Sequence, residues 1–223
     1  MTPWVLIHLN ALEIPTLWQP SLGSEPSQGH LLVVLHGRGD SPQGFAWLQS
    51  ALALPGLSAL LLTAPDPYYG GYSWYDLPPR QLPGILRSRS LLEKVFVELA
   101  RQGFPPERCI LLGFSQGCLM TLEFGARFSP PLAGYIGISG YCYDPRALLA
   151  EGAFLALKGN WLITHGTDDD VLPVARTRAQ IEELQRGGMR VDYREYPKGH
   201  TIEPRFELPE IREWIEKRLN DGK

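Results

Sequence analysis

Hydrophobic residues gather in short, nearly continuous runs along the chain. The clearest runs are 31–35, 57–63, 109–112, 132–138 and 161–164, and the more polar segment 190–196 is expected to form the last strand. Continuous rather than alternating hydrophobicity is typical of strands that are buried on both faces, as in a parallel sheet. Residues 4–18 instead alternate between apolar and polar positions and are broken at Asn10 and Pro15, so they predict a short hairpin at the sheet edge.

Segments with a helical spacing of apolar residues separate these runs. Ser90 is a suitable N-cap for one helix, and Gly103 is a suitable end for it. The other expected helices cover about 45–54, Cys118 to about Phe128, 146–151, 174–186, and a C-terminal stripe of Leu208, Ile211, Ile215 and Leu219. Because strands alternate with helices and no repeat or linker intervenes, we predict one α/β domain over residues 1–223 with a mostly parallel sheet.

Residues 64–86 follow neither the helical nor the strand period. A stretch of this length without regular structure is usually functional. Its tyrosines and Trp74 could line an apolar pocket, or they could pack on one another in a rigid surface loop. The sequence leaves both interpretations open.

Composition and charge exclude several classes of protein. The hydrophobic content of 44% and the charged content of 20% are those of an ordinary soluble globular protein. A net charge of −3 gives no reason to expect nucleic acid or an anionic membrane as a partner. No basic leader and no apolar run of roughly 18 residues is present, so we expect neither secretion nor a membrane span. The three cysteines have no CxxC spacing, which argues against disulfides and a zinc site and favours a cytoplasmic location.

The strand run at 109–112 meets the pentapeptide Gly113–Gly117, after which a helical pattern begins at Cys118. Two glycines around a serine at a turn from strand to helix form a nucleophile elbow, which pushes the hydroxyl of Ser115 out of the sheet edge. The N-terminus of the following helix can stabilise negative charge beside that hydroxyl.

A serine hydroxyl becomes a good nucleophile only when a base takes its proton and a carboxylate orients that base. The chain offers Ser115, the aspartates 168–170 and His200 in the Ser-Asp-His order of such hydrolases. Each follows a predicted strand, and the carboxyl ends of parallel strands meet at one edge of a sheet. A metal site at the aspartates beside His165 is the rival hypothesis, but three consecutive residues cannot all face one ion, so we predict none.

Five motifs follow one another over nearly the whole chain: His36–Asp40, Ser73–Asp76, Gly113–Gly117, His165–Pro173 and Gly199–His200. In these motifs and their order, the chain resembles the carboxylesterase/phospholipase group of α/β-hydrolases, which includes acyl-protein thioesterases and small bacterial carboxylesterases. This resemblance implies an α/β-hydrolase fold with helices on both faces of the sheet and no large cap domain.

The resemblance also implies roles for particular residues. The catalytic acid aligns with Asp169, while Asp168 and Asp170 would face solvent or cap the turn. The backbone N–H groups of Arg38 and Gln116 would form the oxyanion hole, and their side chains would be free to vary. His36 would shape the oxyanion loop. Trp74 and Tyr75 are the expected substrate contacts.

We therefore expect a serine carboxylesterase for small to medium-chain esters, without a metal or organic cofactor. Arg38 departs from the leucine of the thioesterase branch, which favours small or anionic esters over a long lipid, and Cys118 departs from a glycine. The alternatives are an acyl-protein thioesterase or lysophospholipase of this family, a dienelactone-hydrolase relative, and a catalytically silent binding protein. The serine at the elbow counts against the dienelactone-hydrolase relative, and the complete set of Ser115, Asp169 and His200 counts against the silent protein. A homodimer also remains open.

Overall fold

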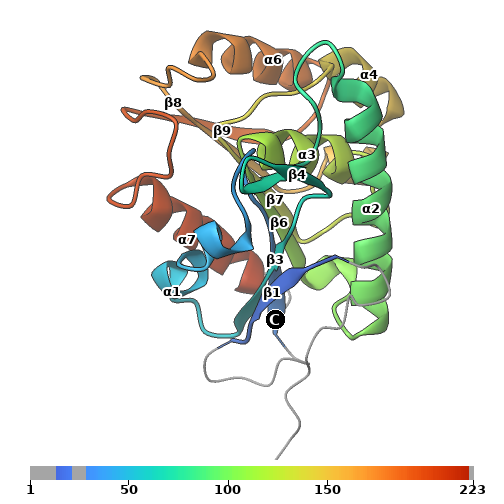
Figure 1. Cartoon of the computed structure of the whole chain (residues 1–223), viewed down its shortest axis with the longest axis vertical. Coiled ribbons are helices and arrows are strands. Elements are labelled where there is room, and N and C mark those ends of the chain that lie inside the picture. Colours follow the sequence, from blue (N-terminus) through green and yellow to red (C-terminus); the bar gives the residue numbers. More distant parts are fainter. Residues whose placement is uncertain (1–13, 22–28, 221–223) are drawn as a thin grey trace, which may run out of the picture.

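The computed structural model describes residues 14–21 and 29–220. Its centre is a seven-stranded sheet with the spatial order β1-β3-β2-β6-β7-β8-β9 (Figure 1). All neighbouring strands are parallel except β1, which pairs antiparallel with β3 at one edge. The mostly parallel sheet expected from the sequence is therefore confirmed. The strands are β1 (Thr16–Gln19), β2 (His30–Leu35), β3 (Leu57–Leu62), β6 (Cys109–Phe114), β7 (Gly134–Ile138), β8 (Trp161–Gly166) and β9 (Val191–Tyr196).

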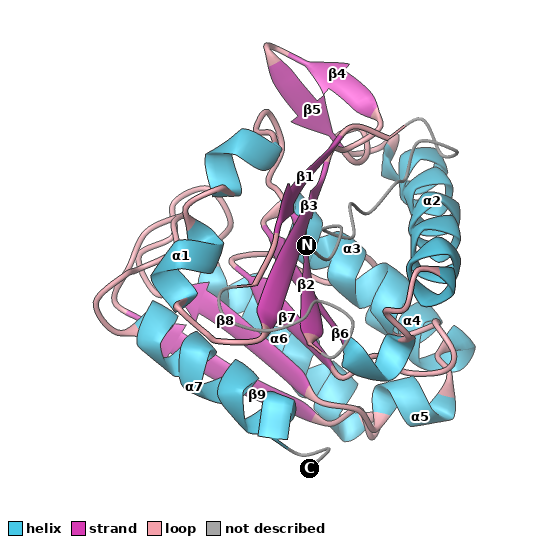
Figure 2. Ribbon diagram, turned by 90° about the horizontal axis from the view of Figure 1, so that it is seen from below, coloured by secondary structure: helices cyan, strands magenta, loops and turns pink. Residues whose placement is uncertain are grey.

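Helices cover both faces of the sheet, as the figures show from two directions (Figures 1 and 2). One face carries α2 (Gln81–Arg101), α3 (Gln116–Gly125), α4 (Pro145–Glu151), α5 (Phe154–Leu157) and α6 (Val174–Arg186), and the other carries α1 (Leu48–Leu52) and α7 (Glu207–Asn220). Successive strand residues belong to different cores: Val33 packs under α2 and α3, whereas Val34 packs on the side of α1 and α7. Both faces must be apolar, which explains the continuous hydrophobic runs.

Two of the predicted helices have wrong boundaries. The helix expected from Ser90 begins nine residues earlier, at Gln81. Pro83 is tolerated there because the first turn of a helix needs no intrahelical N–H donors. The helix expected over 45–54 is instead a 3₁₀ turn, η3 (Pro42–Phe45), followed by the short α1, which ends where Ala53 adopts a left-handed conformation with φ of 47°.

Other differences are smaller. Neither α5 nor the 3₁₀ turn η4 (Pro106–Arg108) was predicted from the sequence. β1 is an edge strand, as the predicted hairpin requires, but most of that hairpin falls in residues 1–13, outside the described residues. No helix within 14–21 and 29–220 has both the length and the apolar character needed to cross a membrane.

The segment predicted as one long loop contains a small hairpin, β4 (Asp66–Tyr68) and β5 (Gly71–Ser73). Figure 2 shows this hairpin projecting beyond the main sheet. It is hydrogen-bonded to the loop after β2, because Gly39 N–H donates to the Tyr72 carbonyl at 2.8 Å and Tyr72 N–H donates to the Asp40 carbonyl at 2.9 Å. These two backbone hydrogen bonds connect residues 64–86 to the loop after β2, which contains the predicted oxyanion-hole residue Arg38.

Candidate active site

Ser115 occupies the turn between β6 and α3. Its backbone has φ of 54° and ψ of −112°, a conformation that residues other than glycine rarely adopt. Its N–H donates to the Ile138 carbonyl at 2.9 Å, and its own carbonyl accepts from Cys118 N–H at 3.0 Å. A Cβ on Gly113 would overlap the Gly117 carbonyl, and a Cβ on Gly117 would overlap the Leu35 carbonyl. The two glycines are therefore required by close backbone packing at the elbow.

His200 and Asp169 lie beside this serine. His200 Nε2 is 3.0 Å from Ser115 Oγ, and His200 Nδ1 is 2.8 Å from Asp169 Oδ2. The imidazole ring packs on Phe114, with the ring centroids 5.0 Å apart. Because the carboxylate can only accept, Nδ1 carries the proton and Nε2 is left to accept from the serine hydroxyl. Three residues that lie far apart in the sequence thus form one line of hydrogen bonds.

The carboxylate of Asp169 is held in place from both sides. Oδ1 accepts from the N–H groups of Val171 at 3.0 Å and Leu172 at 2.8 Å, while Oδ2 faces His200. Burial alone would raise the pKa of Asp169, but the hydrogen bonds from Leu172 and His200 hold it below its usual value, so the group stays ionised. Asp168 and Asp170 are exposed. Of the three adjacent aspartates, only Asp169 reaches His200.

The loop after β2 lies against the elbow. A Cβ on Gly37 would stand 3.1 Å from the Phe114 ring and 3.5 Å from Ser115 Cβ, so the peptide that joins Gly37 to Arg38 is next to the serine. His36 Nε2 accepts from Ala64 N–H at 3.1 Å, so Nδ1 carries the proton that bonds the Gly37 carbonyl at 2.7 Å. Burial lowers the pKa of His36 and keeps it neutral. These contacts agree with a loop-shaping role for His36.

Within the described part of the chain, the backbone N–H groups of Arg38 and Gln116 donate no hydrogen bond. For Gln116 this follows from its position, since the first N–H groups of a helix have no intrahelical acceptor. Both N–H groups belong to the two loops that meet at Ser115, where a developing oxyanion would need donors.

The side chain of Gln116 is not free to vary, contrary to the expectation from sequence. Its Oε1 accepts from Trp74 N–H at 2.9 Å and Ser73 Oγ at 3.1 Å, and its Nε2 donates to the Tyr75 carbonyl at 2.7 Å. Gln116 therefore joins the elbow to the segment after β5. The sequence contains the motifs Ser73–Asp76 and Gly113–Gly117 but has no pattern that predicts the hydrogen bonds between them.

Trp74 also differs from its expected place. Its side chain is 0% exposed, and its indole N–H donates to the His36 carbonyl at 2.9 Å. A side chain buried in the core cannot form a wall of an open substrate pocket, so Trp74 supports the oxyanion loop instead. Tyr75 is equally buried, although it does reach the cavity described next.

A cavity of about 210 Å³ adjoins the oxyanion loop. It is bounded by Arg38, Asp66, Pro67, Tyr68, Ser73, Tyr75, Asp76, Leu77 and Arg80. The guanidinium of Arg38 lies over the Tyr68 ring at 4.9 Å from its centroid. Asp66 is ion-paired with Arg87, and Asp76 lies 3.9 Å from Arg80. Tyr68 thus faces a cavity with several charged lining residues, whereas Trp74 packs in the core.

Comparison with known proteins identifies the family of this chain. A profile of the phospholipase/carboxylesterase family matches residues 23–219. The chain belongs to this family. It is 28% identical over 212 residues to acyl-protein thioesterase 1 of Yarrowia lipolytica, covering 85% of this chain and 92% of that protein. It is 29% identical over 156 residues to carboxylesterase SOBER1 of Arabidopsis thaliana, covering 66% of this chain and 68% of the relative.

Solved structures of relatives have the same fold. Esterase PE8 superposes with a TM-score of 0.82 at 28% identity, covering 92% of this chain and 99% of that one. Arabidopsis thaliana SOBER1 superposes with a TM-score of 0.79 at 26% identity, covering 86% of this chain and 100% of that one. The protein thus has the α/β-hydrolase fold without a large cap domain, and its relatives are named as hydrolases of esters and thioesters.

The described residues were also searched for a cysteine nucleophile and for a metal site. Burial raises the pKa of the Cys118 thiol to about 12, and its side chain is 0% exposed, so it is poorly suited to act as a nucleophile. No group of three or more His, Cys, Asp or Glu side chains within 14–21 and 29–220 is arranged to hold a metal ion.

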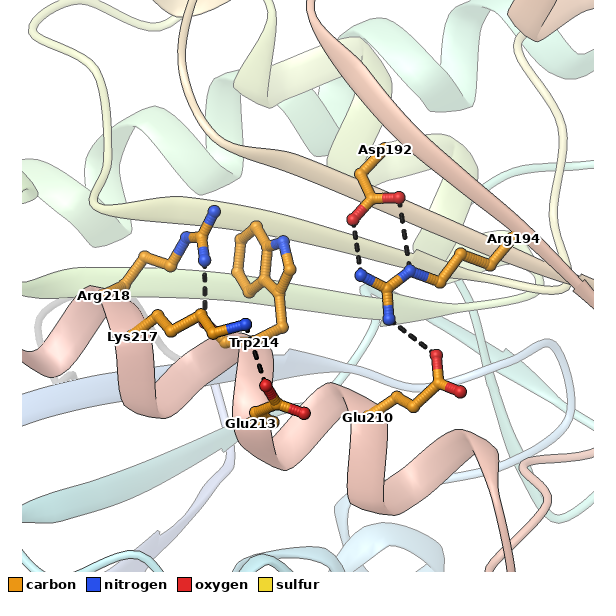
Figure 3. Close-up of a pocket in the computed structure, with 7 residues that line it drawn as sticks. All are labelled: Asp192, Arg194, Glu210, Glu213, Trp214, Lys217 and Arg218. Carbon is orange, nitrogen blue, oxygen red and sulfur yellow. Dashed lines mark hydrogen bonds and ion pairs between the residues drawn. The ribbon is translucent and has the colours of Figure 1, made fainter.

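A second cavity, of about 400 Å³, lies between β9 and α7 (Figure 3). Its charged side chains mostly contact one another: Arg194 bonds Asp192 and Glu210, and Lys217 bonds Glu213. Ser115, Asp169 and His200 line neither cavity, but only the first one includes Arg38, from the loop that lies against Ser115. The lining of the second cavity holds carboxylates, arginines and a lysine, but no serine, cysteine or histidine.

Proposed function

We propose that this protein is a serine hydrolase that cleaves carboxylic esters through an acyl-enzyme on Ser115. The observation that carries the proposal is the 3.0 Å contact between His200 Nε2 and Ser115 Oγ, with Asp169 on the other side of the same ring. The family shown by the comparisons contains esterases and thioesterases, which use acyl transfer.

In the proposed mechanism, Ser115 attacks the ester carbonyl while His200 Nε2 takes the hydroxyl proton. Asp169 keeps the other ring proton on Nδ1 and stabilises the imidazolium that forms. The N–H groups of Arg38 and Gln116 receive the negative charge on the carbonyl oxygen. His200 then protonates the leaving alkoxide, and a water molecule repeats the cycle to release the acid.

The preferred substrates in this proposal are small to medium-chain esters. The cavity beside the proposed oxyanion loop, which Arg38 lines and Ser115, Asp169 and His200 do not, measures about 210 Å³. That is less than the roughly 300–1,000 Å³ of sites that take drug-sized ligands. The exposed guanidinium of Arg38 would also be a poor neighbour for a long alkyl chain, because an apolar chain gains nothing from covering a charge.

A thioesterase is the second candidate, because several relatives are named acyl-protein thioesterase 1. The experiment that separates the two is a series of p-nitrophenyl esters from acetate to palmitate, run beside an acyl thioester of matched chain length. A carboxylesterase should show the highest kcat/KM on the short esters and little on the thioester. The reverse order would favour the thioesterase.

Ser115→Ala should abolish ester hydrolysis and leave the fold intact, because the side chain loses only its hydroxyl. A variant that keeps the wild-type rate would show that the nucleophile lies elsewhere. A fluorophosphonate that labels the wild-type protein but not Ser115→Ala would identify the acylated residue directly.

A further inference from the structure

The loop that carries His200 has little local structure of its own. It runs from Pro197 to Phe206, between the end of β9 and the start of α7, and its residues belong to no helix or strand. Segments of this kind are usually among the more mobile parts of a protein. A base must nevertheless stay within hydrogen-bond reach of its nucleophile. Something outside the triad has to hold this loop.

Lys198, two residues before His200, turns its side chain into the protein. The side chain is 1% exposed and meets the fully buried carboxylate of Glu207, with Nζ 2.6 Å from Oε1 and 2.7 Å from Oε2. Nζ also donates to the Thr201 carbonyl at 2.7 Å and to Ser139 Oγ at 3.2 Å. The ammonium has three N–H donors, and three groups accept from it: the Glu207 carboxylate, the Thr201 carbonyl and the Ser139 hydroxyl.

These contacts lie on both sides of His200. Lys198 precedes it, and Thr201, whose carbonyl Lys198 holds, directly follows it. Glu207 Oε2 accepts in addition from Glu203 N–H at 2.8 Å, which connects the middle of the loop to the first residue of α7. Hydrogen bonds from one buried ion pair therefore fix the chain on both sides of His200.

The same lysine reaches the other two parts of the triad. Its carbonyl accepts from Asp168 N–H at 3.1 Å, next to Asp169. Its ammonium contacts Ser139, whose neighbour Ile138 accepts the N–H of Ser115 at 2.9 Å. A displacement of Lys198 would therefore change the position of the histidine loop relative to both the acid loop and the elbow.

We propose that Lys198 and Glu207 form a clamp that positions His200 for proton transfer from Ser115. The inference rests on the proposed function, because it concerns the same site. Directional hydrogen bonds to a fixed carboxylate define one loop conformation, whereas apolar side chains of similar size would pack in several. Lys198 and Glu207 are positioning residues and do not touch the substrate.

The test replaces the pair by apolar side chains of similar length, in Lys198→Met/Glu207→Leu. Removing both charges together leaves no unpaired buried charge, so this double variant is the one that should still fold. The matched control is Arg194→Gln/Glu210→Gln. That pair joins β9, rather than the loop after it, to α7, with a contact of 2.6 Å, and it lies in the second cavity and is partly exposed (Figure 3).

The expected result is a kcat lower by about 10–100-fold in the clamp variant, as for a misplacement of about 1 Å, with little change in KM. The control variant should keep the wild-type kcat. In proton NMR, the hydrogen-bonded Nδ1–H of His200 should give a far-downfield signal, identified by its loss in Asp169→Asn. That signal should broaden in the clamp variant through exchange with water and stay sharp in the control.

A folded clamp variant with the wild-type kcat and a sharp His200 signal would overturn the proposal, since a purely structural ion pair would behave in this way. If the double variant does not fold, Glu207→Asp decides the matter. It keeps the charge but shortens the reach by one methylene, and an unchanged kcat there would equally overturn the clamp. If the wild-type protein has no hydrolase activity, the proposed function fails, while the NMR comparison still tests the positioning of His200.

Discussion

Asp169→Asn tests the chemistry of the site with almost no change in shape. Oδ1 of Asp169 accepts from the N–H groups of Val171 and Leu172, so the amide oxygen of an asparagine must take this place. The amide nitrogen then faces His200 Nδ1, where Oδ2 lies at 2.8 Å. Because that nitrogen is a donor, Nδ1 has to accept, and the ring proton moves to Nε2. Nε2 then faces Ser115 as a donor and cannot take its proton.

The loss should therefore be large, about 10⁴-fold in kcat, as expected for a triad whose base is held in the wrong tautomer. The assay is the initial rate of p-nitrophenyl butyrate hydrolysis, with the thermal unfolding of each variant as the check on folding. Asp168→Asn and Asp170→Asn are the matched controls, because both side chains are exposed. Near wild-type activity in Asp169→Asn, or a loss confined to Asp168→Asn, would refute this reasoning.

Three further perturbations follow from the same geometry. Gln116→Leu should lower the free energy of unfolding by roughly 1–3 kcal/mol and reduce kcat, because the buried Trp74 N–H loses its acceptor; urea unfolding measures this. Gly117→Ala should cost both activity and thermal stability, since its Cβ would overlap the Leu35 carbonyl; an unchanged melting temperature would contradict the close packing. The native pKa of Asp169 lies below its unfolded value, so its stabilising contribution is complete above about pH 4 and is lost as the pH falls through the native pKa. The stability gap between wild type and Asp169→Asn should shrink accordingly in acid unfolding.

Much of the fold could be predicted because its rules are local. Strands with apolar residues at every position must be buried on both faces, and β2, β3 and β6 confirm this. The helix expected over 174–186 has those bounds, since Pro173 precedes it and Gly187 follows it. The order of Ser115, Asp169 and His200 likewise needed only the template and the strand ends.

The parts that could not be predicted depend on contacts between distant segments. Ser90 is a good N-cap in isolation, yet α2 begins at Gln81, whose buried side chain donates to Tyr141 OH at 2.6 Å. The hairpin of β4 and β5 forms against the loop after β2, which no local pattern encodes. Lys198 and Glu207 resemble ordinary surface charges in the sequence, and only the fold brings them together in the interior.

In the proposed site, the residues that fix the loops differ from the residues that carry out the reaction. Each is anchored by a buried polar side chain that donates or accepts no proton in the proposed reaction: His36 for the oxyanion loop, Gln116 for the elbow, and Lys198 for the histidine loop. These anchors are buried, whereas Arg38 and Tyr68 face the open cavity. Changes in the cavity can therefore alter the accepted ester without moving the triad, and changes in the anchors should lower kcat for every ester alike.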